Sequence, residues 1–468
     1  MKKPNIILFI THDQGQHLSC YNSLQSPNSL KTPNIDSLAE NGVKFENHFC
    51  TAPQCSPSRG SIITSKYPHQ NGLMGLVNWG WTLPESNMTF PMYLKENGYT
   101  THLIGFQHES RDVSTLGYDT VSKRVVNYQY SCTISEDKYY NFFYEHLNDD
   151  KPFYVCIGTP EVHRPFLAWG KPVDPKSVKV PPYLPDHELI REDMAEFYGA
   201  IHTVDKVIGR VLKCLQLTGL KKNTIFIYTT DHGIHFPRAK CSLYDPGIKT
   251  LLIMNWPEST LFSGGKVIKS MISNIDLLPT ILDLIDAEIP KSIEGKSFLP
   301  ILKEETQSIR NNIYAEKSFH EIYDPMRCVR TRNYKYIHNF KNSDTLYQLT
   351  KDIPASKILK KQVKNPRMEE ELYDLEADSL EMNNLINNPE YESIADELRK
   401  KLNDWMVRTN DPILNGVIKP PPLWLDNYNK LKVAHDILYF FLLNNLVPRL
   451  MKIGFVHKIL SKLMRYFP

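Results

Sequence analysis

Four strand-like stretches, each followed by polar residues, dominate the hydrophobic pattern of the chain. They cover residues 6–10, 100–105, 153–157 and 224–228. Runs of this length that are rich in β-branched and aromatic residues are typical of strands buried on both faces of a parallel sheet. Apolar residues also recur at helical spacing from about Glu192 to Leu217, ahead of Gly219. Strand and helix patterns alternate, which predicts an α/β fold.

Histidine and aspartate residues follow all four predicted strands. In chain order they are His12 with Asp13, then His108, then His163, and finally Asp231 with His232. Ligands of open α/β sheets bind beyond the carboxyl ends of the strands. Each of these residues alone could be an ordinary loop residue. Their convergence at one edge of a sheet predicts a functional site there.

After about residue 330 the pattern changes to short strand-like pieces. Tyr334–Ile337 and Glu371–Leu375 have this character, and a helical pattern covers residues 391–405. This order predicts a smaller antiparallel sheet with a helix. We therefore divide the chain into an α/β domain that carries the site (1–330), an α+β subdomain (331–425) and a tail (426–468).

The tail has a basic amphipathic pattern. From Ile437 to Pro468 there is no acidic residue, and lysines and arginines alternate with apolar residues. The apolar run at 437–443 is too short to span a bilayer. Two interpretations stay open: contact with an anionic membrane surface, or an extra helix pair packed on the α/β domain or on a second subunit. The apolar stretch at 6–10 is also too short for a signal sequence, so we expect a cytoplasmic protein, with peripheral membrane contact through the tail as an option.

Charge and cysteine content narrow the function classes. The chain has 55 Lys plus Arg against 52 Asp plus Glu, a net charge of +3 over 468 residues. So small an excess argues against nucleic acid as a partner. The 8 cysteines contain no C-x-x-C pair, so neither a zinc knuckle nor a disulfide framework is indicated.

The sharpest local signal is the segment Cys55-Ser56-Pro57-Ser58-Arg59. Proline is favoured in a first helical turn, so Cys55 should lie just ahead of a helix N-terminus, where free N–H groups favour an anion. A cysteine there, beside Arg59, has a depressed pKa. The residues alone leave two interpretations, a thiolate nucleophile or a small buried side chain.

This segment resembles the sulfatase signature C-x-P-S-R. The resemblance extends along the chain through residues 4–8, 31–39, 42–45 and 231–233. Within the family the chain is most similar to the N-sulfoglucosamine sulfohydrolase (sulfamidase) group, through residues 68–76, 233–237 and 320–327. The resemblance implies an alkaline-phosphatase-like fold, with a mixed sheet between helices. It also implies an enzyme that removes an N-sulfate or O-sulfate group from a sulfated sugar.

The resemblance assigns a role to each candidate catalytic residue. A formylglycine-generating maturation enzyme would oxidise Cys55 to formylglycine, whose hydrated aldehyde is the nucleophile. His108 would act as base and His163 as the acid that protonates the leaving group. Arg59 and Lys240 would hold the sulfuryl oxygens.

The resemblance also implies one divalent cation. Its ligands would be His12, Asp13, Asp231, His232 and a formylglycine oxygen from Cys55. Calcium is the ion expected first. The family usually has Asp where this chain has His12, however, and a histidine ligand makes Mn²⁺ or Zn²⁺ more favourable than an all-oxygen site would. Alternatively, His12 turns away and the carboxylates alone bind the ion.

Two further parts of the chain bear on the substrate. Phe106 stands where the family normally has a lysine that binds sulfate, so slower turnover is expected unless another cation, Arg164 or Arg238, substitutes for that lysine. The stretch that contains His320, Glu321 and Arg327 resembles the substrate wall of the sulfamidase group, so these residues could contact the sugar. Alternatively, they form a surface salt bridge. The alternatives to a sulfatase are a phosphonate or phosphate ester hydrolase of the same superfamily and a non-catalytic binder of sulfated glycans.

Overall fold

Strand β1 (Asn5–Thr11) lies inside a nine-stranded mixed sheet and is buried along its whole length. The computed structural model describes residues 3–21, 30–122, 136–341 and 367–426, together with positions 353, 358 and 429. Strands β5 (Phe153–Gly158) and β6 (Thr224–Thr230) flank β1 in parallel, and β3 (Thr100–Gly105) pairs in parallel with β5. The parallel strands predicted from the apolar runs are confirmed.

The remaining strands make the sheet mixed. In spatial order the main path is β4 (Thr120–Ser122), β3, β5, β1, β6, β8 (Leu252–Asn255), β2 (Val43–Phe49) and β7 (Lys249–Thr250), and β9 (Lys266–Ser273) pairs with β2. β8 runs antiparallel to β6 and to β2. The expected α/β fold is present, with antiparallel pairing confined to the side of the sheet beyond β6.

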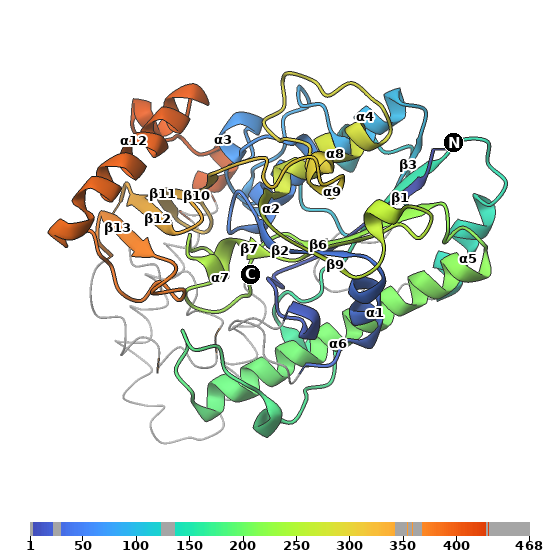
Figure 1. Ribbon diagram of the computed structural model, residues 1–468, viewed down its shortest axis with the longest axis horizontal. Coiled ribbons are helices and arrows are strands. Elements are labelled where there is room, and N and C mark those ends of the chain that lie inside the picture. The colour runs from blue at the N-terminus through green and yellow to red at the C-terminus, as the bar shows by residue number, and fades with distance from the viewer. Residues whose placement is uncertain are drawn as a thin grey trace. The chain divides into compact units, whose positions relative to one another are not determined.

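Helices cover both faces of this sheet (Figure 1). The α-helices of the described residues are α1 (Pro33–Asn41), α2 (Cys55–Thr64), α3 (Pro68–Asn71), α4 (Phe90–Glu96), α5 (Glu136–Glu145), α6 (Glu188–Leu217), α7 (Asp245–Ile248), α8 (Leu277–Leu284), α9 (Leu299–Leu302) and α12 (Glu392–Arg408). Helix α6 confirms the predicted helix and begins earlier than expected, because the side chain of His187 caps it by accepting from the Leu189 N–H. α1 and α6 lie on one side of the sheet, and α2, α4 and α8 on the other.

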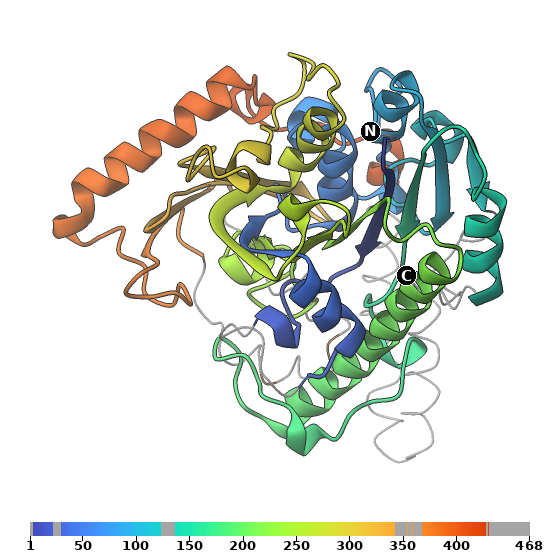
Figure 2. The ribbon, with the colours of Figure 1, turned by 45° about the vertical axis from the view of Figure 1, so that its right-hand side comes forward.

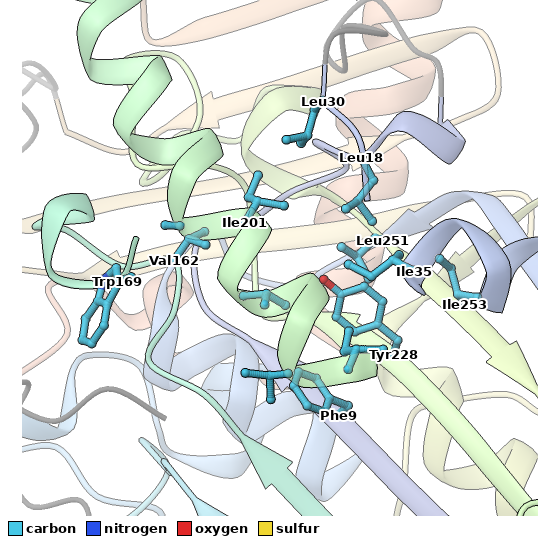
Figure 3. Close-up of a cluster of buried hydrophobic side chains, with 14 of the residues drawn as sticks. Phe9, Leu18, Leu30, Ile35, Val162, Trp169, Ile201, Tyr228, Leu251 and Ile253 are labelled. Carbon is cyan, nitrogen blue, oxygen red and sulfur yellow. The ribbon is translucent and has the colours of Figure 1, made fainter. Parts of the chain in front are cut away.

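The main core fills the space between the sheet and α6. Alternate residues of β1 and β6 point to this face, among them Phe9 and Tyr228, and Ile201 of α6 belongs to the same buried cluster (Figure 3). All three side chains are completely buried, and such burial is the main stabilising contribution to a fold. This core holds β1 and β6 side by side and so fixes where their carboxyl ends meet.

A second, antiparallel sheet contains β10 (Ile313–Phe319), β11 (Tyr323–Arg330), β12 (Tyr334–Asn339) and β13 (Glu370–Asp374), in that order. Helix α12 packs on β11 and β12, as Figure 2 also shows. The smaller sheet and its helix are confirmed. The boundary predicted after residue 330 falls inside this sheet, between β11 and β12.

Residues 1–418 form one compact unit, and the chain from 419 onward is assigned to a second. Nearly all of the basic amphipathic tail lies outside the described residues. Within the described part of the chain, no helix is both long and apolar enough to cross a membrane.

A buried charge cluster joins the small sheet to α3 and to the C-terminal end of the first unit. Arg327 donates to both carboxylate oxygens of Asp411, at 2.5 and 2.9 Å. Glu316 accepts from the backbone and ring nitrogens of His69, and its carboxylate lies 3.8 Å from the Arg327 Nε. Burial would raise the pKa of Asp411, but Arg327 lowers it below its ordinary value. Arg327 thus neutralises buried carboxylates inside the fold.

Replacing this arginine tests the structural role. Arg327→Met leaves Glu316 and Asp411 buried without their cation, so the free energy of unfolding in urea should fall by about 3–5 kcal/mol. The control is Lys400→Met, which removes an exposed pair with Asp404 and should change stability little. A stable Arg327→Met protein with weakened substrate binding would contradict this assignment and favour the predicted substrate role.

Candidate active site

The carboxyl ends of β1, β3, β5 and β6 bring the predicted residues to one edge of the sheet. His12 and Asp13 follow β1, and Asp231 and His232 follow β6, its direct neighbour. The Asp13 N–H donates to the Asp231 carboxylate at 2.9 Å, with Asp13 at a φ of 53°. Gly233 is required beside them, because a Cβ there would lie 1.9 Å from the Pro246 carbonyl oxygen.

Five buried side chains form a cluster with the composition of a metal site: His12, Asp13, Cys55, Asp231 and His232. His12 Nδ1 lies 2.8 Å from Asp13 Oδ1 and 3.3 Å from Asp231 Oδ2. His232 Nε2 lies 3.1 Å from Asp13 Oδ1 and 3.3 Å from the Cys55 sulfur. One ligand atom from each residue lies within 4.8 Å of every other. His12 therefore turns toward the cluster, not away from it.

The electrostatics of this cluster call for a cation. Burial opposes the charge on both histidines, yet Asp231 and the groups around it raise the pKa of His12 to about 9 and that of His232 to about 10. The two carboxylates thus draw protons onto the neighbouring imidazoles. His232 Nδ1 lies 2.9 Å from the Gly233 carbonyl oxygen, and a proton there would leave Nε2 free as a ligand, which is how metal-bound histidines are usually oriented. The donor set fits one divalent ion of the calcium, manganese or zinc kind.

Cys55 is the first residue of α2, so the helix predicted from Pro57 is present and begins at Cys55 itself, not just after it. Two contacts hold this helix end in place. Gln54 Nε2 donates to the Phe319 carbonyl at the end of β10, and Ser58 Oγ donates to the Asp231 carbonyl. Burial would raise the pKa of the Cys55 thiol, but His12 and Lys240 hold that pKa well below its usual range.

Two buried cations border the cluster. Arg59 Nε lies 3.1 Å from Asp231 Oδ2, and its Nη2 donates to the Thr11 carbonyl. Lys240 Nζ lies 2.7 Å from Asp13 Oδ2. Burial disfavours both charges, but Asp231 raises the pKa of Arg59 and Asp13 raises that of Lys240, so both stay charged. This positive charge beside Cys55 suits an anionic substrate.

Three further histidines, His163, His108 and His235, complete the site. His163 Nε2 lies 3.8 Å from Asp13 Oδ2, and its Nδ1 lies 2.7 Å from the Arg164 carbonyl oxygen. Burial, helped by Lys240, lowers the pKa of His163 to about 3. His108 packs beside His12, with ring centroids 6.0 Å apart, and burial lowers its pKa as well. Both imidazoles are therefore neutral before an anion enters.

His235 is a site residue that the sequence prediction missed. Its Nδ1 lies 3.5 Å from Asp13 Oδ2, and its ring faces His163 with centroids 5.8 Å apart. The signal was its position four residues after Asp231, in the loop that leaves β6 at the site edge.

The structure separates the three predicted substrate residues. His320 and Glu321 are half-buried in the turn between β10 and β11, directly after the Phe319 carbonyl that holds Gln54. Burial, helped by the charge of Lys240, lowers the pKa of His320 to about 3. Arg327 is instead committed to Asp411.

Neither arginine proposed to replace the missing lysine supplies a free cation. Arg164 donates to both oxygens of Asp193, at 2.7 and 2.5 Å. Arg238 donates to the carbonyls of Leu380 and Glu381. In the described residues, Arg59 and Lys240 are thus the cations in contact with the carboxylates of the cluster.

Comparisons with known proteins identify the family of the chain. The profile of the family described as Sulfatase matches residues 4–287, and that described as N-sulphoglucosamine sulphohydrolase, C-terminal, matches residues 231–370. An ulvan-active sulfatase of Formosa agariphila is 29% identical, covering 93% of this chain and 86% of the relative. The human N-sulphoglucosamine sulphohydrolase is 27% identical, covering 87% of this chain and 91% of the relative.

Solved structures share the fold. One, described as a complex with its substrate D-glucosamine-2-N,6-O-disulfate, superposes with a TM-score of 0.67 at 22% identity, covering 88% of this chain and 99% of its own. Another, a 2-O GAG sulfatase, superposes with a TM-score of 0.68 at 22% identity, covering 90% and 96%. The alkaline-phosphatase-like architecture expected from the sequence is confirmed.

Metal binding tests the assignment of the cluster. Asp231→Asn removes a carboxylate that both histidines face, so binding of Ca²⁺ or Mn²⁺ to chelator-treated protein should weaken at least about tenfold by calorimetry. The matched control is Glu316→Gln in the other buried group of His69, Glu316 and Asp411, where Arg327 already supplies the positive charge. Equal loss in both variants, or none in Asp231→Asn, would contradict the assignment.

Proposed function

Since this chain belongs to the sulfatase family, we propose that it hydrolyses the sulfate ester or sulfamate of a sulfated sugar, using formylglycine made from Cys55. The observation that carries the proposal is the position of Cys55. It lies at a helix N-terminus, 3.3 Å from His232, inside a buried group of carboxylates and imidazoles. Arg59 and Lys240 add positive charge where a sulfuryl group would have to bind.

The relatives support a sugar as the substrate. The similar proteins include one named for ulvan and one named for N-sulfated glucosamine. The match to the C-terminal profile of the second group runs through residues 231–370, which contain the half-buried turn of His320 and Glu321. We propose that this turn contacts the sugar. The target bond is an N-sulfate or an O-sulfate.

The family uses formylglycine and a metal ion, and the residues of this chain fit both. Hydrated formylglycine supplies a hydroxyl nucleophile for sulfur. His12, Asp13, Asp231 and His232 would hold the cation, which offsets negative charge on the sulfuryl oxygens. We propose calcium first. The two imidazoles make Mn²⁺ and Zn²⁺ the alternatives to test.

The remaining residues bind the sulfuryl group and move protons. Arg59 and Lys240 donate hydrogen bonds to its oxygens. An entering anion brings negative charge next to His163, which raises the pKa of this histidine from about 3 and lets it take up a proton. His163 then gives that proton to the sugar oxygen or nitrogen as the bond to sulfur breaks. His108, neutral in the free site, would accept the proton of the second hydroxyl of formylglycine, which is the proton transfer that releases sulfate and restores the aldehyde.

The maturation partner must act early. Cys55 is only 2% exposed, and Arg59 one turn further along α2 is 1% exposed. A formylglycine-generating enzyme could not reach this thiol in the folded chain. We propose that conversion precedes folding.

Sulfate release tests the proposal. Purified protein should release sulfate from N-sulfated or O-sulfated glucosamine, detected by ion chromatography, and Cys55→Ala should reduce the rate at least about 10⁴-fold because the nucleophile is lost. Cys328→Ala, which alters a buried thiol of the small sheet, is the control and should keep its activity.

Two outcomes would favour the other candidates. Faster release of phosphate than of sulfate from paired esters of one sugar would indicate a phosphate or phosphonate hydrolase. Tight binding of an intact sulfated sugar by aldehyde-bearing protein, with no sulfate released, would indicate a binding protein.

A further inference from the structure

Phe106 occupies the centre of a group of site residues, although it carries no charge. It follows β3, and its N–H donates to the Gly158 carbonyl at 2.8 Å. The side chain is 6% exposed. Its backbone is closely packed, because a Cβ on Gly158 would lie 1.8 Å from the Phe106 carbonyl oxygen. The position of this ring is therefore closely set by β3 and β5.

Three functional groups pack around the ring. The Arg59 guanidinium carbon lies over it, 5.1 Å from the centroid. The ring of His12 lies 5.3 Å away and that of His108 lies 5.4 Å away, measured between centroids. Phe106 thus contacts Arg59, which is proposed to bind the sulfuryl group, the proposed metal ligand His12 and the proposed base His108.

Arg59 is the group that needs such a support. Its Nε and Nη2 are bound to Asp231 and to the Thr11 carbonyl, which hold one edge of the guanidinium. Its Nη1 has no hydrogen-bond partner among the described residues, although the side chain is fully buried. A buried N–H donor without an acceptor costs free energy unless a ligand completes it. The face of an aromatic ring attracts a guanidinium and resists tilting of its plane.

We propose that Phe106 is a positioning residue: its ring face holds the Arg59 guanidinium so that Nη1 remains available to an anionic sulfuryl oxygen. The inference rests on the proposed function, because it assigns the anion to that site. It gives Phe106 an aromatic role in place of a cationic one. Only an aromatic ring at this position provides the attracting face, so an aliphatic side chain of similar bulk should not substitute.

Binding of inorganic sulfate to the full-length protein, measured by calorimetry, tests the inference. Phe106→Leu keeps an apolar side chain but removes the ring face, and should raise the dissociation constant for sulfate about fivefold. Phe106→Tyr keeps the face and should bind sulfate within about twofold of the wild type. With a hydrolysed substrate, Phe106→Leu should also raise KM more than it lowers kcat.

The matched control is Phe49→Leu. Phe49 is fully buried, and its ring centroid lies 4.4 Å from the guanidinium carbon of Arg330, which donates to Asp245 outside the site. This variant should lower the thermal midpoint as much as Phe106→Leu does but leave sulfate affinity unchanged.

Three results would overturn the inference: unchanged affinity in Phe106→Leu, equal loss in Phe106→Tyr and Phe106→Leu, or no sulfate binding by the wild type. A different result would contradict the proposed function: wild-type protein that binds sulfate but releases no sulfate from any sulfated sugar.

Discussion

The site depends on two carboxylates, Asp13 and Asp231, that are completely buried at the ends of neighbouring parallel strands. Burying unpaired carboxylates is very costly, so positive groups must surround them. Lys240 compensates the charge of Asp13, and Arg59 compensates that of Asp231. The two carboxylates also raise the pKa values of His12 and His232, because a protonated imidazole offsets their negative charge. A bound divalent ion would neutralise the negative charge of the two carboxylates directly. The same positive shell that stabilises the carboxylates is also what an anionic substrate would meet.

The fold delivers the nucleophile to these carboxylates from a distant part of the chain. Helix α2 starts at Cys55, and its first turn is bound to the Asp231 carbonyl through Ser58. The small sheet supports the loop ahead of the helix, because the Glu316 N–H donates to the Thr51 carbonyl and Gln54 donates to Phe319. The second sheet therefore helps to position the loop that precedes Cys55. Its buried cluster around Arg327 keeps β10 and β11 in place for that task.

Local sequence patterns predicted the parts of the structure that depend on local rules. The parallel strands could be found because both of their faces are buried, and the site edge could be found because polar residues follow them at once. The start of α2 followed from Pro57. Arg327 could not be assigned in this way, because its partner Asp411 lies 84 residues away in the chain. For the same reason the boundary near residue 330 was placed inside a sheet whose pairing is visible only in three dimensions. His235 was missed because a single histidine in a loop carries no periodic signal, and its approach to Asp13 depends on how the loop after β6 folds.

The proposed mechanism requires conversion of Cys55 to formylglycine, and mass spectrometry of the Cys55 peptide detects this conversion directly. The peptide should come from protein made in its own host, because conversion needs the host's maturation enzyme. We expect an aldehyde at position 55 and unchanged thiols at the other cysteines. An unmodified Cys55 in protein that still releases sulfate from sugars would contradict the account, and would point instead to the thiolate that His12 and Lys240 favour.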